Sequence, residues 1–165
     1  MTDNKPASGD HTTHGVPHGR TSLTPHIVVS RAGEAVEFYR DVLGARVEDI
    51  TRMGDLIAHA ELDFGSGFLT VSDPLPGYGL AATDTTDDAT YSLAVYVDDV
   101  DTVMALAEKA GATIREPATT FVSGDRFGSF IDPFGVRWSP MTRVEDLSPE
   151  ESRRRVTEWA ATQQT

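Results

Sequence analysis

The sequence contains no cysteine, and this excludes several kinds of site at once. Without thiols there is no disulfide framework, no thiolate zinc site and no cysteine nucleophile. Long apolar runs are also missing, because no stretch approaches the roughly 18 residues that a membrane helix needs. Residues 1–19 are polar and lack the apolar core of a signal peptide. We therefore expect a cytoplasmic protein that is soluble and does not bind membranes.

Basic residues are scarce, with 14 Lys and Arg against 26 Asp and Glu and a formal net charge of −12. Nucleic acids and anionic membranes attract clustered Lys and Arg, so this balance argues against both as partners. It places no such limit on a small neutral or cationic ligand. The length of 165 residues suits one domain, or two very small modules that share a core.

Residues 1–20 are rich in Thr, Gly, His, Asp and Pro and show no hydrophobic periodicity, so we expect a flexible arm. Three histidines lie in it, at positions 11, 14 and 18. A metal site there would have to order the whole arm, which costs conformational entropy. We therefore interpret the three histidines as an accidental cluster.

After residue 20 the same order of elements, strand–helix–three strands, is predicted twice. Hydrophobic periodicity and turn residues place the first set at 26–29, 34–43, 46–50, 56–64 and 68–72. They place the second set at 92–97, 100–110, 113–115, 128–131 and 136–141. Residues 44–47 match 111–114 at an offset of 67, and Asp-Phe-Gly at 63–65 matches Asp-Pro-Phe-Gly at 132–135 at an offset of 69. Two offsets that nearly agree indicate an internal repeat.

The repeat sets the expected domain organisation. One βαβββ module covers 21–73 and another covers 91–147, with a linker at 74–90. A helix and tail follow at 148–165, because Ser148, Pro149 and Glu151 form a capping box. The apolar face of this helix carries Val156, Trp159 and Ala160, and we expect it to pack on its own domain or on a second subunit.

Several motifs together resemble one known family. They are Thr-Pro-His-Ile-Val-Val at 24–29, Phe-Tyr-x-x-x-Leu-Gly at 38–44, His-Ala-Glu-Leu at 59–62, Gly-Asp-Arg at 124–126 and Asp-Pro-Phe-Gly at 132–135. With the repeated element order, residues 21–156 resemble the PhnB-like branch of the vicinal-oxygen-chelate superfamily of glyoxalases, bleomycin-resistance proteins and extradiol dioxygenases. The resemblance implies an α+β fold: two βαβββ modules form a cupped eight-stranded mixed sheet around one site, with the C-terminal helix added. It does not set the chemistry, because one fold carries many activities.

The resemblance also implies where a metal would bind. Metal-dependent members use His or Glu from the first and last strand of each module, and the aligned positions in this sequence are His26, Thr70, Ser92 and Ser139. Three of these residues are neutral hydroxyls, which are poor ligands for zinc, nickel or iron. We therefore expect the usual metal cage to be missing and no cofactor to be required. The four residues remain candidates for contact with a ligand.

His59 and Glu61 are the candidate catalytic residues. They lie two apart on a predicted strand, so their side chains share one face. With His26 they could form a 2-His-1-carboxylate site for a divalent metal, or His59 could act as a general base beside the carboxylate. The alternative is structural: the two residues pair with each other or with an arginine such as Arg126.

Asp125, Arg126 and Trp138 complete the candidate ligand-binding residues. Arg126 could offer its planar fork to a carboxylate or phosphonate, or Asp125 and Arg126 could form an ion pair that fixes their loop. Trp138 could line the pocket with the phenylalanines at 121, 127 and 130, although aromatic residues on strands are more often core. Asp132 is interpreted as a turn residue.

These observations leave three hypotheses about function. The first is a metal-independent binding protein of the bleomycin-resistance type for a small organic molecule, and the acidic surface suits a cationic compound. The second is a lyase, isomerase or dioxygenase with a metal at an altered site built from His26, His59 and Glu61. A purely structural role of the terminal helix has the least support. We expect a homodimer, because closed two-fold symmetry is the commonest arrangement.

Overall fold

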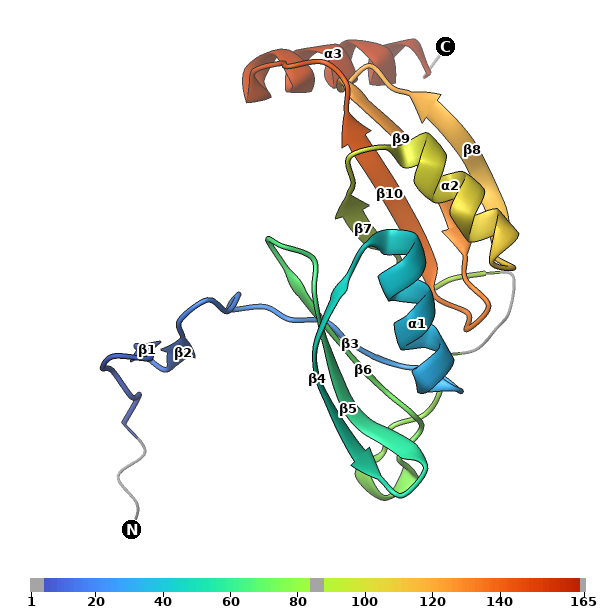
Figure 1. Ribbon diagram of the computed structural model, residues 1–165. Coiled ribbons are helices and arrows are strands. Elements are labelled where there is room, and N and C mark those ends of the chain that lie inside the picture. Colours follow the sequence, from blue (N-terminus) through green and yellow to red (C-terminus); the bar gives the residue numbers. More distant parts are fainter. Residues whose placement is uncertain (1–4, 84–87, 164–165) are drawn as a thin grey trace. The chain divides into compact units, whose positions relative to one another are not determined.

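The computed structural model describes residues 5–83 and 88–163, and the fold is α+β as predicted (Figure 1). The chain divides into two compact units, Met1–Ala82 and Thr83–Thr165, and each unit contains one βαβββ module. Residues 1–4 of the predicted arm, 84–87 of the predicted linker and 164–165 of the predicted tail lie outside the described residues. Within the described ranges, no helix combines the length and the hydropathy needed to cross a membrane.

The first module forms a mixed four-stranded sheet with the order β3-β6-β5-β4. Strand β3 runs parallel to β6, whereas the β6–β5 and β5–β4 pairs are antiparallel. The elements are β3 (His26–Val28), α1 (Ala32–Leu43), β4 (Arg46–Met53), β5 (Leu56–Asp63) and β6 (Phe68–Ser72). Each predicted element of this module is therefore present, and β4 is longer than predicted.

Helix α1 decides which face of the first sheet is buried. Its apolar stripe packs on one side of the strands, where Ile27, Ala60 and Val71 are almost fully buried. Gly44 ends the helix with a φ of 72°, a conformation that glycine adopts without strain. Because side chains alternate along a strand, polar residues occupy the opposite side of this sheet. We call that side the polar face; the register places on it Asp49, Thr51, His59, Glu61, Asp63, Thr70, Ser72 and His26, together with the ring of Phe68.

The second module repeats this arrangement with the order β7-β10-β9-β8, and β7 runs parallel to β10. Equivalent strand order in both sheets confirms the internal repeat. The elements are β7 (Leu93–Tyr96), α2 (Val100–Lys109), β8 (Thr113–Thr120), β9 (Asp125–Ile131) and β10 (Arg137–Arg143). Helix α2 begins at Asp99, whose side chain accepts hydrogen bonds from the backbone N–H groups of Asp101 and Thr102.

Asp132 is a turn residue, as predicted, and it also anchors the core of the second module. Its buried carboxylate accepts hydrogen bonds from the backbone N–H groups of Phe134 and Val136, each at 2.9 Å. The second carboxylate oxygen accepts the indole N–H of Trp138 at 3.0 Å. One side chain therefore satisfies three buried donors and joins the β9–β10 turn to the last strand.

The structure differs from the sequence-based prediction mainly at short elements and strand ends. Strands β1 (Thr12–Thr13) and β2 (Val16–Pro17) form a small hairpin in the arm, and a 3₁₀ helix occupies Pro76–Tyr78; none of these was predicted. Strand β8 was predicted to end before Pro117, yet it continues past this residue. It can do so because Pro117 lies on an edge strand, within an irregularity in the register.

The C-terminal helix α3 (Pro149–Thr162) begins as predicted. The Ser148 side chain accepts a hydrogen bond from the backbone N–H of Glu151 at 3.2 Å. None of the helix's described residues is fully buried. The helix is held at its start, where the hydroxyl of Ser152 donates to the carbonyl of Ser123.

We predict that Asp132→Ala lowers the free energy of unfolding by about 2–3 kcal/mol, because three buried N–H groups lose their acceptor. Urea denaturation measures the change. The matched control is Asp98→Ala, since Asp98 is exposed on the same module. Equal stability of the two variants would contradict the anchoring role of Asp132.

Candidate functional site

One row across the first sheet brings predicted site residues together. His26 lies opposite Thr70, Thr70 lies opposite Glu61, and Glu61 lies opposite Asp49. His59 is two residues from Glu61 on β5, so it projects from the same side. The polar face therefore gathers His26, His59, Glu61 and Thr70, four of the residues that the sequence indicated.

Both ring nitrogens of His26 make hydrogen bonds with hydroxyl groups. Nδ1 lies 2.7 Å from Oγ1 of Thr70, and Nε2 lies 3.2 Å from Oγ of Ser72. The Thr70 hydroxyl also donates to the carbonyl of Pro25 at 3.3 Å, so its oxygen is left to accept from Nδ1–H. This network places a proton on Nδ1 and fits a neutral ring in which Nε2 accepts from Ser72.

The electrostatic surroundings of His26 also favour the neutral ring. Partial burial lowers the pKa of His26, and the neighbouring His59 lowers this pKa further. The two imidazoles are stacked, with ring centroids 6.4 Å apart and planes within 6° of parallel. A positive charge on His26 would therefore lose part of its hydration and would also repel a charge on His59.

Glu61 forms an ion pair with Arg20, the last residue of the predicted arm. The guanidinium of Arg20 also lies over the ring of Phe68, 4.6 Å from its centroid. The structure thus confirms that an arginine pairs with Glu61 but replaces the suggested Arg126 by Arg20.

Sequence reasoning missed Arg20, Phe68 and Ser72. Strand alternation could have found the last two, because they flank Thr70 at a spacing of two.

The positions equivalent to the family's metal ligands do not offer a suitable donor set. In the first module His26 faces Thr70, and the corresponding pair in the second module is Ala94 and Ser139. The register therefore corrects the sequence alignment: Ser92 precedes β7, and Ala94 is the residue opposite Ser139. One imidazole, two hydroxyls and a methyl group provide no anionic ligand for a divalent cation. Contact of Ser92 with a ligand stays a prediction.

The alternative metal site at His26, His59 and Glu61 is not assembled. Thr70 and Ser72 engage the nitrogens of His26, and Arg20 engages the carboxylate of Glu61. Among the residues that the structure describes, no group of three His, Asp or Glu side chains is arranged to hold a metal ion. A metal at this site would have to displace one of the two hydroxyls from His26 and to displace Arg20 from Glu61.

Asp125 and Arg126 do not pair with each other, because neighbouring residues on β9 project to opposite sides. Asp125 forms an ion pair with Arg143 at 2.9 Å and accepts a hydrogen bond from the hydroxyl of Tyr96 at 3.3 Å. Arg126 binds Asp101 at the start of α2 through two hydrogen bonds of 2.7 and 2.6 Å. The Arg126 guanidinium, which was predicted to contact a ligand, thus binds a carboxylate of the same module.

Trp138 lies on the side of the second sheet that α2 covers, and it is 2% exposed. Its indole faces Asp132 within the core. This corrects the assignment of Trp138 as a ligand-lining residue and supports the alternative interpretation as core. Ser139, the next residue along β10, projects to the other side and is half-buried.

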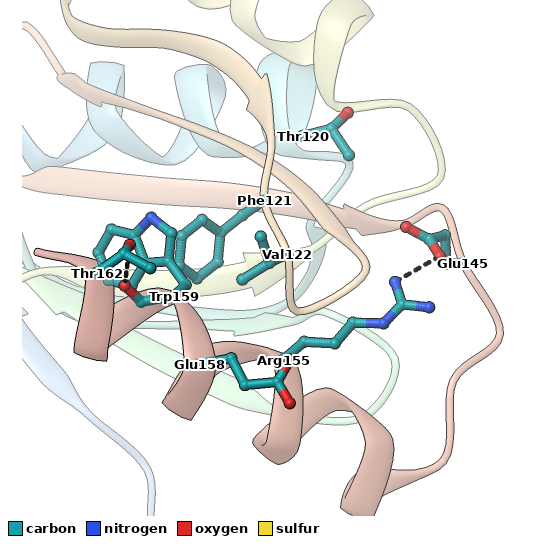
Figure 2. Close-up of a pocket in the computed structure, with 8 residues that line it drawn as sticks. All are labelled: Thr120, Phe121, Val122, Glu145, Arg155, Glu158, Trp159 and Thr162. Atoms are coloured by element: carbon teal, nitrogen blue, oxygen red, sulfur yellow. Dashed lines mark hydrogen bonds and ion pairs between the residues drawn. The ribbon is translucent and has the colours of Figure 1, made fainter.

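A separate open hollow of about 580 Å³ lies between α3 and the turn that joins β8 to β9 (Figure 2). Phe121 and Trp159 form one wall, with rings edge to face and centroids 4.9 Å apart. Arg155 points toward Glu145 and forms an ion pair with it at 2.9 Å. The predicted apolar face of the C-terminal helix therefore packs partly on its own module, while Trp159 remains 42% exposed.

A comparison with known families agrees with this architecture. The model of the Glyoxalase/Bleomycin resistance protein/Dioxygenase superfamily matches residues 10–139. The chain belongs to this superfamily. An uncharacterized protein of Mycobacterium tuberculosis (strain H37Rv) is 30% identical over 139 residues, which cover 79% of each chain.

Solved structures of the superfamily fold are similar as well. The protein PA1353 from Pseudomonas aeruginosa has a TM-score of 0.61 at 24% identity, covering 74% of this chain and 98% of that one. The PhnB protein from Bacillus cereus has a TM-score of 0.58 at 19% identity, covering 74% and 99%. At these identities the likeness shows the fold, and the chemistry of the site must come from the residues of this chain.

We predict that His26 titrates below the ordinary range of histidine and that His59→Ala moves its pKa part of the way back, since burial is the larger cause. The folded state then binds fewer protons than the unfolded chain just below the ordinary pKa of about 6.5. The stability that His26 contributes is therefore present above that pH. It is lost as the pH falls from that value through the lower pKa of His26 in the folded protein. NMR titration of the His26 ring measures the shift.

The control for this titration is His18→Ala, because His18 bonds to Thr13 within the arm. This variant should leave the titration of His26 unchanged. A His26 pKa at or above the ordinary value in the unaltered protein would contradict the assigned neutral ring.

Proposed function

We propose that the protein binds a small organic molecule on the polar face of the first sheet, without the divalent metal that metal-dependent superfamily members use. The hydrogen bonds between the ring of His26 and the hydroxyls of Thr70 and Ser72 carry this proposal. They occupy both ring nitrogens, one of which a metal would need, and they hold the imidazole in a fixed orientation. A fixed neutral ring with a polar rim suits contact with an uncharged or weakly polar part of a ligand.

His59 is the group on this face that is available to a ligand. It is half-buried, stacks on His26 and makes no hydrogen bond within the described part of the chain. An imidazole in this state can donate to a ligand, accept from it, or take a proton from it. We therefore assign His59 as the principal ligand contact and, if the protein is an enzyme, as the general base. The carboxylate of Glu61, two residues away on β5, acts on His59 through its negative charge.

The alternative is a lyase, isomerase or dioxygenase with a metal at His26, His59 and Glu61. That function requires a metal to displace one hydroxyl, Thr70 or Ser72, from His26 and to displace Arg20 from Glu61. Elemental analysis of untagged protein separates the two proposals. The arm should carry His11→Ala, His14→Ala and His18→Ala, so that its histidines do not bind metal. Stoichiometric metal that is lost in His59→Ala would support the enzyme and contradict the metal-free site.

The proposed ligand site is tested by screening a set of small organic fragments by NMR against labelled, full-length protein. We expect fragments that perturb signals of residues 26, 59 and 70. His59→Ala should weaken their binding about tenfold, the effect of losing one hydrogen bond.

His18→Ala again supplies the control, and it should leave fragment binding unchanged. Fragments that bind without perturbing these residues, or that bind the His59→Ala variant equally well, would contradict the proposed site. The cytoplasmic location and the homodimer remain predictions from the sequence.

A further inference from the structure

The polar face holds an organic cation that comes from outside the sheet, the side chain of Arg20. Its guanidinium pairs with the carboxylate of Glu61 and lies over the ring of Phe68. Both partners belong to the sheet: Glu61 lies opposite Thr70, and Phe68 is two residues before Thr70 on β6. Arg20 comes from outside the sheet, six residues before the start of β3.

A carboxylate beside the face of an aromatic ring is a recognition site for organic cations. The carboxylate supplies Coulomb attraction, and the ring supplies a cation–π contact. The Glu61 side chain is only 18% exposed, so its charge is partly removed from water and requires a positive partner. Arg20 provides that partner when no other cation is present.

We propose that Glu61 and Phe68 form a cation subsite, and that Arg20 is an internal occupant which a ligand displaces. The ligand is a small organic molecule that carries a guanidinium, amidinium or ammonium group. This inference rests on the proposed function, because it assigns a ligand class to the same polar face. Arg20 thereby competes with the ligand for the subsite.

Release of Arg20 leaves the sheet intact. The backbone N–H of Arg20 donates to Pro17, and the backbone bonds of Gly9 to Thr12 and of His18 to His11 also lie within the arm. The Arg20 side chain is 39% exposed, so its guanidinium regains water easily. Its departure therefore costs one ion pair and one ring contact, both of which an arriving cation restores.

The neighbouring charges favour a cation at this subsite. Asp63 on the same face is already held by Arg46 at 2.5 Å and by the backbone N–H of Gly65 at 2.6 Å. Asp49 lies opposite Glu61 and adds a second negative charge to the row. Without Arg20, the region around Glu61 is negative and would repel an anionic group.

The subsite also fits the rest of the proposed site. His59 is two residues from Glu61 on the same strand and side. A cation held by Glu61 and Phe68 would therefore place the body of the ligand beside His59 and the stacked His26. One charged group would fix the ligand, and the imidazole of His59 would contact its uncharged part.

Benzamidine, a planar aromatic amidinium, tests this inference by calorimetry on the full chain, and benzamide is its neutral control. We expect Arg20→Ala to bind benzamidine about tenfold more tightly than the unaltered protein, because the competing guanidinium is gone. The double variant Arg20→Ala with Glu61→Gln should lose that gain. Benzamide should bind weakly to all of these proteins.

The matched arginine control is Arg40→Ala, because Arg40 is ion-paired with Glu37 and Asp41 on the surface of α1. It should bind benzamidine like the unaltered protein. Equal affinity of Arg20→Ala and the unaltered protein, or a gain that survives Glu61→Gln, would overturn the cation subsite. Neutral fragments that still bind at His59 would, in that case, leave the proposed function standing. Thermal melts confirm that each variant is folded.

Discussion

The imidazole of His26 is held at both nitrogens by hydroxyl groups of a single strand, and the character of the site follows from this interaction. Thr70 and Ser72 are two apart on β6, so both face His26 across the parallel β3–β6 pair. Both ring nitrogens are thereby engaged, and a metal at His26 would have to displace one of the two hydroxyls. In the second module the equivalent pair is Ala94 and Ser139, which adds no stronger ligand. The fold is that of its superfamily, whereas the donor set at these positions is different.

Much of the fold could be predicted from the sequence, because hydrophobic period and turn residues are local signals. The repeat offsets identified two modules, and the capping box at Ser148 identified the last helix. The sequence could also predict that neighbouring strand residues lie on opposite faces of the sheet. Trp138 and Ser139 are neighbours, so their side chains had to project to opposite sides. Strand register was not accessible, because only backbone pairing decides whether Ser92 or Ala94 lies opposite Ser139.

The partners of charged residues were the least predictable part of the site. Glu61 pairs with Arg20, which lies in a segment without periodicity and therefore carried no structural signal. Arg126 binds Asp101, and Asp125 binds Arg143, so an adjacent pair of opposite charges is split between two sides of a strand. Arginine side chains are long and flexible, so they form ion pairs with carboxylates that are close in space. The spacing of the two residues in the sequence is a weak guide to these pairs. The arm consequently contributes the side chain of Arg20 to the site, a cation within a strongly acidic protein.

The most direct test is the ¹⁵N spectrum of the His26 imidazole before and after addition of one equivalent of Zn²⁺, in protein that carries His11→Ala, His14→Ala and His18→Ala. We expect a neutral ring with its proton on Nδ1, and ¹⁵N chemical shifts of His26 that do not change when the metal is added. If the ring nitrogens of His26 and His59 moved together to metal-bound values, the hydroxyl-held, metal-free site would be contradicted.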